Sequence, residues 1–158
     1  MWKKIKPNVI SIAIALAVGG LSAFLTRESM NIYQEINRPP LSPPSWLFPV
    51  VWTILYVLMG ISAAMIYTDA ASTPAERERA LGTYAASLLA NFGWSLIFFN
   101  HRAFFLAFLW LLVLLFLIVK MILQFYKIKP LAAYLQIPYA VWVTFAGYLN
   151  VAIWLLNR

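Results

Sequence analysis

The chain has 158 residues, of which 63 % are hydrophobic and only 11 % are charged, with a formal net charge of +7. A soluble domain of this length cannot bury so much apolar surface, so the composition indicates an integral membrane protein. The absence of cysteine excludes disulfides and thiolate chemistry, and the basic residues are scattered among apolar segments instead of forming the stripe typical of nucleic-acid binding.

The first apolar segment covers residues 9–26 and follows a short basic stretch. Its length suits a membrane-spanning helix. A cleaved signal peptide is the alternative, but the segment is longer than a signal core, and residues 26–28 lack a small-x-small cleavage pattern. The small residues Gly19, Gly20 and Ala23 lie within about one turn, so a neighbouring backbone or a flat ligand can approach the helix closely there.

A polar connection, residues 27–41, follows the first segment and is too long for a simple turn. It contains Met30, Ile32, Tyr33 and Ile36 at spacings that suit a short amphipathic helix. Long loops with an apolar face of their own often act as lids. A helix lying among lipid headgroups is the alternative, and the two readings are compatible.

A proline-stiffened stretch then runs directly into the second apolar segment. The hydroxyl of Ser42 is expected to cap this helix, with Pro43 in the first helical position, where a missing amide proton costs nothing. Pro49 would then fall about two turns into the helix and bend it. Such a bend would leave the face that carries Trp52 and Tyr56 concave.

Four more segments have the length needed to span a hydrocarbon core of about 30 Å at about 1.5 Å per residue. They are residues 45–68, 80–99, 103–125 and 131–156. The sequence therefore predicts an all-α fold, in which residues 1–158 form one domain of five transmembrane helices with a long lid loop between the first two. The remaining connections are short, so sequential helices should be antiparallel neighbours.

The lysine and arginine residues of alternate connections predict the orientation. One side would carry Lys3, Lys4, Lys6, Arg77, Arg79, Lys127 and Lys129, and the other Arg27, Arg38, Arg102 and Arg158. The positive-inside rule then places the N terminus in the cytoplasm and the lid loop outside, in a bacterial cell membrane. Lys120 lies within the fourth segment, near its basic end, where its long side chain can reach the interface.

The spans offer little for acid-base or metal chemistry. Apart from Lys120 they contain no charged residue, which argues against a pump with a carboxylate pair or a proton relay. His101 is the only histidine and falls in a tight loop, where a solvated side chain is more usual than a haem or metal ligand. We therefore expect no catalytic residues, no metal and no cofactor, and a binding protein more than an enzyme.

Aromatic and uncharged polar residues recur at helical spacing in three of the segments. The three faces comprise Trp52 and Tyr56, then Asn91, Trp94, Ser95 and Phe98, and finally Pro138, Trp142, Ala146 and Asn150. Where such faces meet, they form an apolar cavity with a few polar groups, which suits a large, flat, weakly polar ligand. The alternative is that tryptophans form interfacial belts, and we accept it for Trp46, Trp110 and Trp154.

The third segment also carries a stripe of small residues, Gly82, Ala86 and Ala90. Small residues at every fourth position allow close approach of two helices in a membrane. The stripe therefore predicts a homodimer interface on a face next to Asn91.

Three sequence blocks carry a resemblance to a known family. They are Pro39 to Pro44 with Trp46 to Tyr56, then Asn91 to Phe99, and then Pro138 to Asn150. In this order they resemble the tryptophan-rich sensory protein family, whose animal members are the translocator proteins. The resemblance extends over nearly the whole chain. One departure is Leu41, where some relatives have tryptophan, and it is expected to loosen the contacts of the lid.

The resemblance implies a five-helix receptor or carrier in tetrapyrrole or stress regulation. Its ligands would be porphyrins such as protoporphyrin IX and other haem precursors, isoquinoline or benzodiazepine drugs and, in animals, cholesterol. Carried over position by position, the implied ligand contacts are Tyr33, Trp52, Tyr56, Asn91, Trp94, Ser95, Trp142 and Ala146. The alternatives are an enzyme that degrades porphyrin with light and oxygen, using Trp52 and Trp142 as reactive indoles, and a regulatory protein whose partner contacts respond to ligand.

Overall fold

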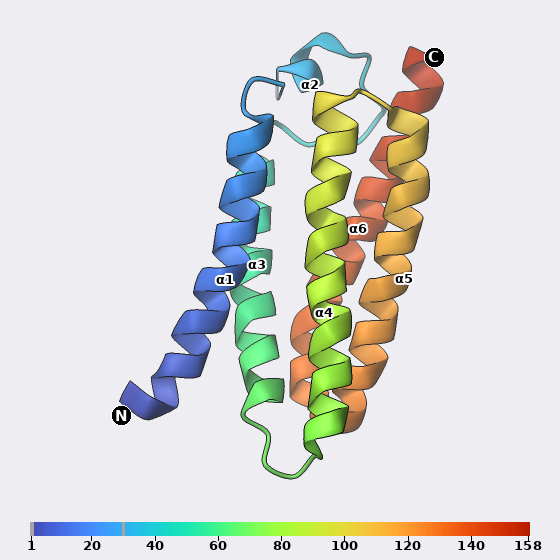
Figure 1. Ribbon diagram of the computed structural model, residues 1–158. Coiled ribbons are helices and arrows are strands. Elements are labelled where there is room, and N and C mark those ends of the chain that lie inside the picture. Colours follow the sequence, from blue (N-terminus) through green and yellow to red (C-terminus); the bar gives the residue numbers. More distant parts are fainter. Residues whose placement is uncertain (1, 30) are drawn as a thin grey trace.

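The computed structural model describes residues 2–29 and 31–158, so the predicted contribution of Met30 to the lid lies outside it. All regular elements in these residues are helical (Figure 1). They are α1 (Trp2–Thr26), α2 (Ile32–Glu35), α3 (Leu47–Tyr67), α4 (Pro74–Ser95), the π-helical turn η1 (Leu96–Asn100), α5 (Phe104–Ile128) and α6 (Pro130–Asn157).

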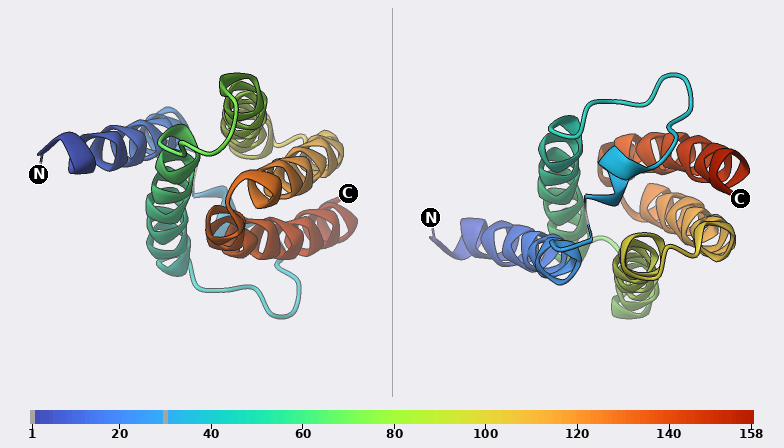
Figure 2. Two further views of the ribbon diagram at one scale, coloured as in Figure 1. Left: turned by 90° about the horizontal axis from the view of Figure 1, so that it is seen from below. Right: turned by 90° about the horizontal axis from the view of Figure 1, so that it is seen from above.

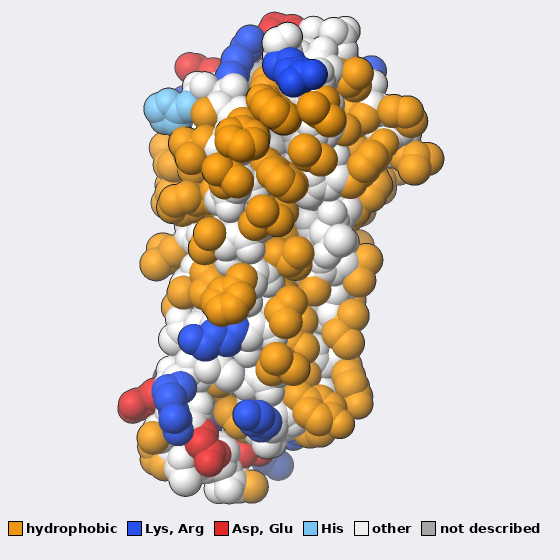
Figure 3. Space-filling model, turned by 90° about the vertical axis from the view of Figure 1, so that its right-hand side faces the viewer, with side chains coloured by type: hydrophobic (Ala, Val, Ile, Leu, Met, Phe, Trp, Pro, Cys, Tyr) orange, Lys and Arg blue, Asp and Glu red, His pale blue; other side chains and the backbone are white. Residues whose placement is uncertain are grey.

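Five of the helices in the described residues are long and apolar enough to cross a membrane, with α4 and η1 forming one of them. The side of the molecule seen in Figure 3 is covered by hydrophobic side chains over most of its height, and most charged groups lie near the two ends. The chain is therefore a multi-pass membrane protein. The prediction of an all-α bundle of five spanning helices is confirmed.

The helices form a ring in which α1 contacts α3, α3 contacts α6, α6 contacts α5, and α5 contacts α4, while α4 returns to α1 (Figure 2). The N terminus and the C terminus lie at opposite ends of the bundle. The N-terminal half of α1 diverges from the other helices, and the first buried residue along α1 is Ala15.

Two glycines set the approach of α1 to α3. A Cβ atom at Gly60 would lie 2.5 Å from the Cα atom of Ile12, which is closer than any packed pair of carbon atoms. A Cβ atom at Gly19 would collide with the ring of Tyr56. The two helices are therefore in direct backbone contact at Gly60 and Ile12, and the ring of Tyr56 packs against Gly19.

The predicted start of the second spanning helix is wrong. Helix α3 begins at Leu47, and Ser42 does not cap it, because its hydroxyl donates instead to the carbonyl oxygen of Pro39 at 2.6 Å. Pro43 consequently lies in the loop, and Pro49 falls in the first turn of α3. A proline there removes no helical hydrogen bond, so the expected bend has no cause.

Helix α4 begins earlier than the apolar run predicted, because Thr73 and Glu76 form a reciprocal capping box and Pro74 occupies the first turn. The preceding loop is ordered by Ser72, which donates hydrogen bonds to the Asp69 carboxylate and lowers its pKa. At its other end, the helix widens into the π-helical turn η1, a feature often found at functional sites.

Candidate ligand-binding cavity

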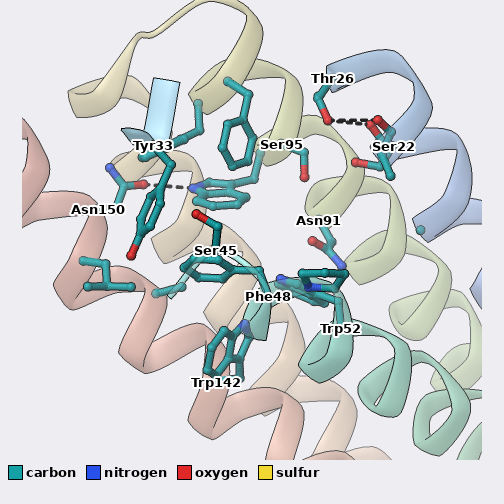
Figure 4. Close-up of a pocket in the computed structure, with 18 of the residues that line it drawn as sticks. Ser22, Thr26, Tyr33, Ser45, Phe48, Trp52, Asn91, Ser95, Trp142 and Asn150 are labelled. Atoms are coloured by element: carbon teal, nitrogen blue, oxygen red, sulfur yellow. Dashed lines mark hydrogen bonds between the residues drawn. The ribbon is translucent and has the colours of Figure 1, made fainter. Parts of the chain in front are cut away.

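A cavity of about 290 Å³ lies at the loop end of the bundle, enclosed by α1, α3, α4, η1, α6 and the connection between α1 and α3 (Figure 4). Its lining residues are Gly19, Ser22, Ala23, Thr26, Tyr33, Ser45, Phe48, Pro49, Trp52, Tyr56, Asn91, Trp94, Ser95, Phe98, Phe99, Trp142, Ala146, Leu149, Asn150 and Ile153. None of these side chains is charged, so the cavity is an apolar space with a few hydroxyl and amide groups.

The structure brings all eight sequence-derived candidates to this one cavity. Tyr33 comes from α2, Trp52 and Tyr56 from α3, and Trp142 and Ala146 from α6. Helix α4 supplies the remaining three, Asn91, Trp94 and Ser95. Residues 113 positions apart in the sequence thus face one space.

Aromatic rings that contact one another line the cavity in separate groups, one of which begins in the loop. The ring of Tyr33 meets that of Phe48 edge-on at 5.1 Å between centroids, and Phe48 meets Trp142 at 5.9 Å. In a second group, the rings of Trp52 and Tyr56 lie 5.6 Å apart with a tilt of 31°. Aromatic pairs at these distances stabilise each other by about 0.5–1.5 kcal/mol, which favours the observed ring positions.

Some polar groups of the cavity form hydrogen bonds within the protein, and others have no partner among the described residues. Asn91 donates from Nδ2 to the hydroxyl oxygen of Tyr56 at 3.0 Å, and Trp94 donates from Nε1 to Oδ1 of Asn150 at 2.9 Å. Within residues 2–29 and 31–158, no acceptor lies within hydrogen-bond reach of the indole N–H of Trp52 or Trp142. These two donors therefore remain available to a ligand.

The connection between α1 and α3 covers the cavity and is fastened to the bundle at several points. Figure 2 shows α2 lying across the end of the bundle. Asn37 and Asn157 exchange hydrogen bonds between side chain and backbone at 3.0 and 2.9 Å, and the hydroxyl of Tyr148 donates to the carbonyl oxygen of Pro40 at 2.6 Å. The exposed ion pair between Glu35 and Arg102, at 3.1 Å, adds at most about 1 kcal/mol.

Several lining residues were not predicted. Phe48 lies inside the first sequence block, four residues before Trp52, so the spacing of Trp52 and Tyr56 extends to it. Phe98 belongs to the face predicted for the third segment, whereas Phe99 does not, and both line the cavity because η1 has a wider turn than an α-helix. Ser22 and Thr26 lie four residues apart on the buried side of α1, a spacing that could have been used to predict them.

Fold and cavity together define a class, namely a five-helix membrane protein with an uncharged, aromatic-lined ligand cavity beneath a loop. The chain belongs to the TspO/MBR family, whose model matches residues 11–155. It is 34 % identical to the tryptophan-rich protein TspO of Chlorobaculum tepidum, over 99 % of each chain. It is also 32 % identical to the translocator protein of Bos taurus, over 94 % of this chain and 89 % of that protein. The tryptophan-rich sensory protein of Cereibacter sphaeroides is 32 % identical, over 79 % and 76 %.

Proposed function

We propose that the protein is a membrane receptor or carrier that binds flat hydrophobic ligands, porphyrins such as protoporphyrin IX foremost, in the cavity beneath the loop. The observation that carries the proposal is the pairing of an uncharged aromatic lining with two available indole donors, Trp52 and Trp142. A weakly polar conjugated ring offers area for stacking and a few acceptor atoms, which this lining matches. Sterols and benzodiazepine or isoquinoline compounds meet the same requirements less completely.

The size of the cavity limits how a porphyrin can enter it. A volume of about 290 Å³ is at the small end of ligand pockets, so a porphyrin needs the covering loop to move outward as it enters. The loop is held mainly by hydrogen bonds at its surface, so it can move without disturbing the packing of α3, α5 and α6.

A titration of the purified protein with protoporphyrin IX in darkness tests the proposal. We expect saturable binding, and the porphyrin should be recovered intact. Trp52→Phe and Trp142→Phe keep an aromatic wall but lose the indole donor, so each should weaken binding by about 1 to 2 kcal/mol at most. Failure of the wild-type protein to bind the porphyrin at one saturable site would contradict the proposal.

The same titration under illumination tests the alternative, porphyrin degradation with light and oxygen. That alternative has some support in the placement of Trp52 and Trp142 on one cavity. If the indoles react, the two substitutions should nearly abolish the loss of porphyrin absorbance in light while leaving dark binding largely in place. Product formed in the dark, without added oxidant, would contradict both the receptor and this alternative.

We also propose that the N terminus is cytoplasmic and the C terminus lies outside, in a bacterial cell membrane. The proposal rests on the excess of basic residues among the connections at one end of the bundle. A C-terminal alkaline phosphatase fusion should be active, and a C-terminal fluorescent protein should remain dark. The reverse pair of results would invert the orientation.

A homodimer through α4 is our proposal for assembly. Gly82 is exposed, and a Cβ atom there would meet nothing within 4 Å, while Ala86 is half-buried. Ala90 is buried within the chain, and its carbonyl oxygen accepts a hydrogen bond from Trp110 at 2.7 Å, so Gly82 and Ala86 form the open part of the stripe.

Replacing Ala86 with leucine should therefore give monomers that still bind porphyrin, because the added side chain separates the two helices without reaching the cavity. The molar mass of the protein in detergent, from light scattering, measures this effect. A dimer that persists unchanged in the variant would place the interface elsewhere.

A further inference from the structure

Asn150 is a fully buried amide on α6, and other helices hold both of its polar atoms. Its Oδ1 accepts the hydrogen bond from Trp94 at 2.9 Å, and its Nδ2 donates to the backbone carbonyl oxygen of Phe104 at 2.8 Å. Figure 4 shows the first of these bonds as a dashed line from Asn150 to an indole ring. An indole N–H can only donate and a carbonyl oxygen can only accept, so the orientation of the amide follows from its partners.

These two bonds join three helices at the cavity, which both Trp94 and Asn150 line. Trp94 stands near the end of α4, and Phe104 is the first residue of α5. Between them lie the π-helical turn and Arg102, whose positive φ of 50° is uncommon for a residue with a side chain. Asn150 therefore fixes the two ends of an irregular segment against α6.

The consequence for Trp94 is that its ring is held in one orientation and its only donor is occupied. The ring stacks on Phe98 with 5.1 Å between centroids and 27° between planes. An indole has a single N–H group, so a ligand meets Trp94 as an aromatic surface and not as a hydrogen-bond donor. Trp52 and Trp142 differ in this respect, since the described part of the chain provides no acceptor for either N–H.

We infer that Asn150 is a positioning residue of the cavity, which fixes the ring of Trp94 and withholds its N–H group from the ligand. A ligand would then stack against Trp94 and direct its acceptor atoms toward Trp52 and Trp142. The second statement rests on the proposed function, whereas the first concerns the protein alone.

The first statement is tested by exchange of the indole N–H protons with deuterium, followed by NMR on the protein without ligand. Trp110 on α5, which donates to the carbonyl oxygen of Ala90 and has no contact with Asn150 through this bond, is an internal control. We expect slow exchange at Trp94 and Trp110. Asn150→Leu should speed exchange at Trp94 by about 3- to 10-fold, the equivalent of one hydrogen bond, and leave Trp110 unchanged.

A matched variant separates positioning from general loosening. A neutral buried carboxyl group can accept from Trp94 and donate to Phe104, so Asn150→Asp should keep slow exchange at Trp94. Equal acceleration at Trp94 and Trp110 in Asn150→Leu, or no acceleration at either, would overturn the inference.

The second statement is tested by protoporphyrin titration in the dark. Asn150→Leu should weaken binding by about tenfold in the wild-type background but by less than about twofold in Trp94→Phe, where no indole remains to be positioned. An equal loss in both backgrounds would contradict a role through Trp94. If exchange behaves as expected but the wild-type protein does not bind protoporphyrin, the positioning stands and the proposed function fails.

Discussion

Gly60→Leu is expected to abolish measurable protoporphyrin binding, although Gly60 does not line the cavity. Any side chain at this position would meet the backbone of Ile12, so α1 must move away from α3. Helix α1 supplies one wall of the cavity through Gly19, Ser22, Ala23 and Thr26, and a displaced α1 opens that wall. Overpacking of this kind typically costs about 1–3 kcal/mol, so the thermal unfolding temperature should fall as well.

Gly20→Leu is the matched control for this experiment. Gly20 lies on α1, the helix that Gly60 contacts, but a Cβ atom at Gly20 would meet nothing within 4 Å, so leucine should point into lipid. The control variant should bind protoporphyrin like the wild-type protein. Normal binding by Gly60→Leu would show that the contact between α1 and α3 does not shape the site.

Ala146→Trp is expected to weaken protoporphyrin binding by about 100-fold. The side chain of Ala146 faces the cavity from α6, one turn after Trp142, and an indole there would occupy much of a space of about 290 Å³. If a ligand loses about 100 Å² of apolar contact at about 25 cal/mol per Å², binding weakens by about 2.5 kcal/mol, which is close to two orders of magnitude. Titration in the dark measures the effect.

Val141→Trp is the control for the effect of adding an indole to α6. Val141 is 63 % exposed on the outer surface of this helix, where tryptophan is well tolerated near lipid. This variant should retain wild-type affinity. A similar affinity for Ala146→Trp would exclude the cavity as the porphyrin site.

The sequence predicted the class of fold because membrane-spanning helices must satisfy their backbone groups internally and are therefore long apolar runs. It predicted helix ends less well. The start of α4 is determined by the capping box of Thr73 and Glu76, outside the apolar run, and the start of α3 lies beyond the predicted cap at Ser42. The loop between α2 and α3 contains four prolines and two serines, which offer several possible caps, and tertiary contacts select among them.

The residues of the candidate site could also be predicted only in part, because some of their positions depend on tertiary structure. Spacing within one helix shows which residues share a face, so Trp52 and Tyr56, or Trp142 and Ala146, were accessible from the sequence. Residues whose position in the cavity depends on contacts between helices, or on irregular turns, could not be predicted in this way. The cavity-facing position of Phe99 next to Phe98 follows from a π-helical turn, and the hydrogen bond from Trp94 to Asn150 depends on how α4 and α6 are placed.

The most direct measurement is an experimental structure of the protein with protoporphyrin IX bound in the dark. We expect an intact porphyrin between α1, α3, α4 and α6, stacked against Trp94, with its acceptor atoms toward Trp52 and Trp142. The loop that carries Tyr33 should have moved outward relative to the ligand-free arrangement. A porphyrin bound on the lipid-facing surface, with the cavity unchanged, would contradict the account.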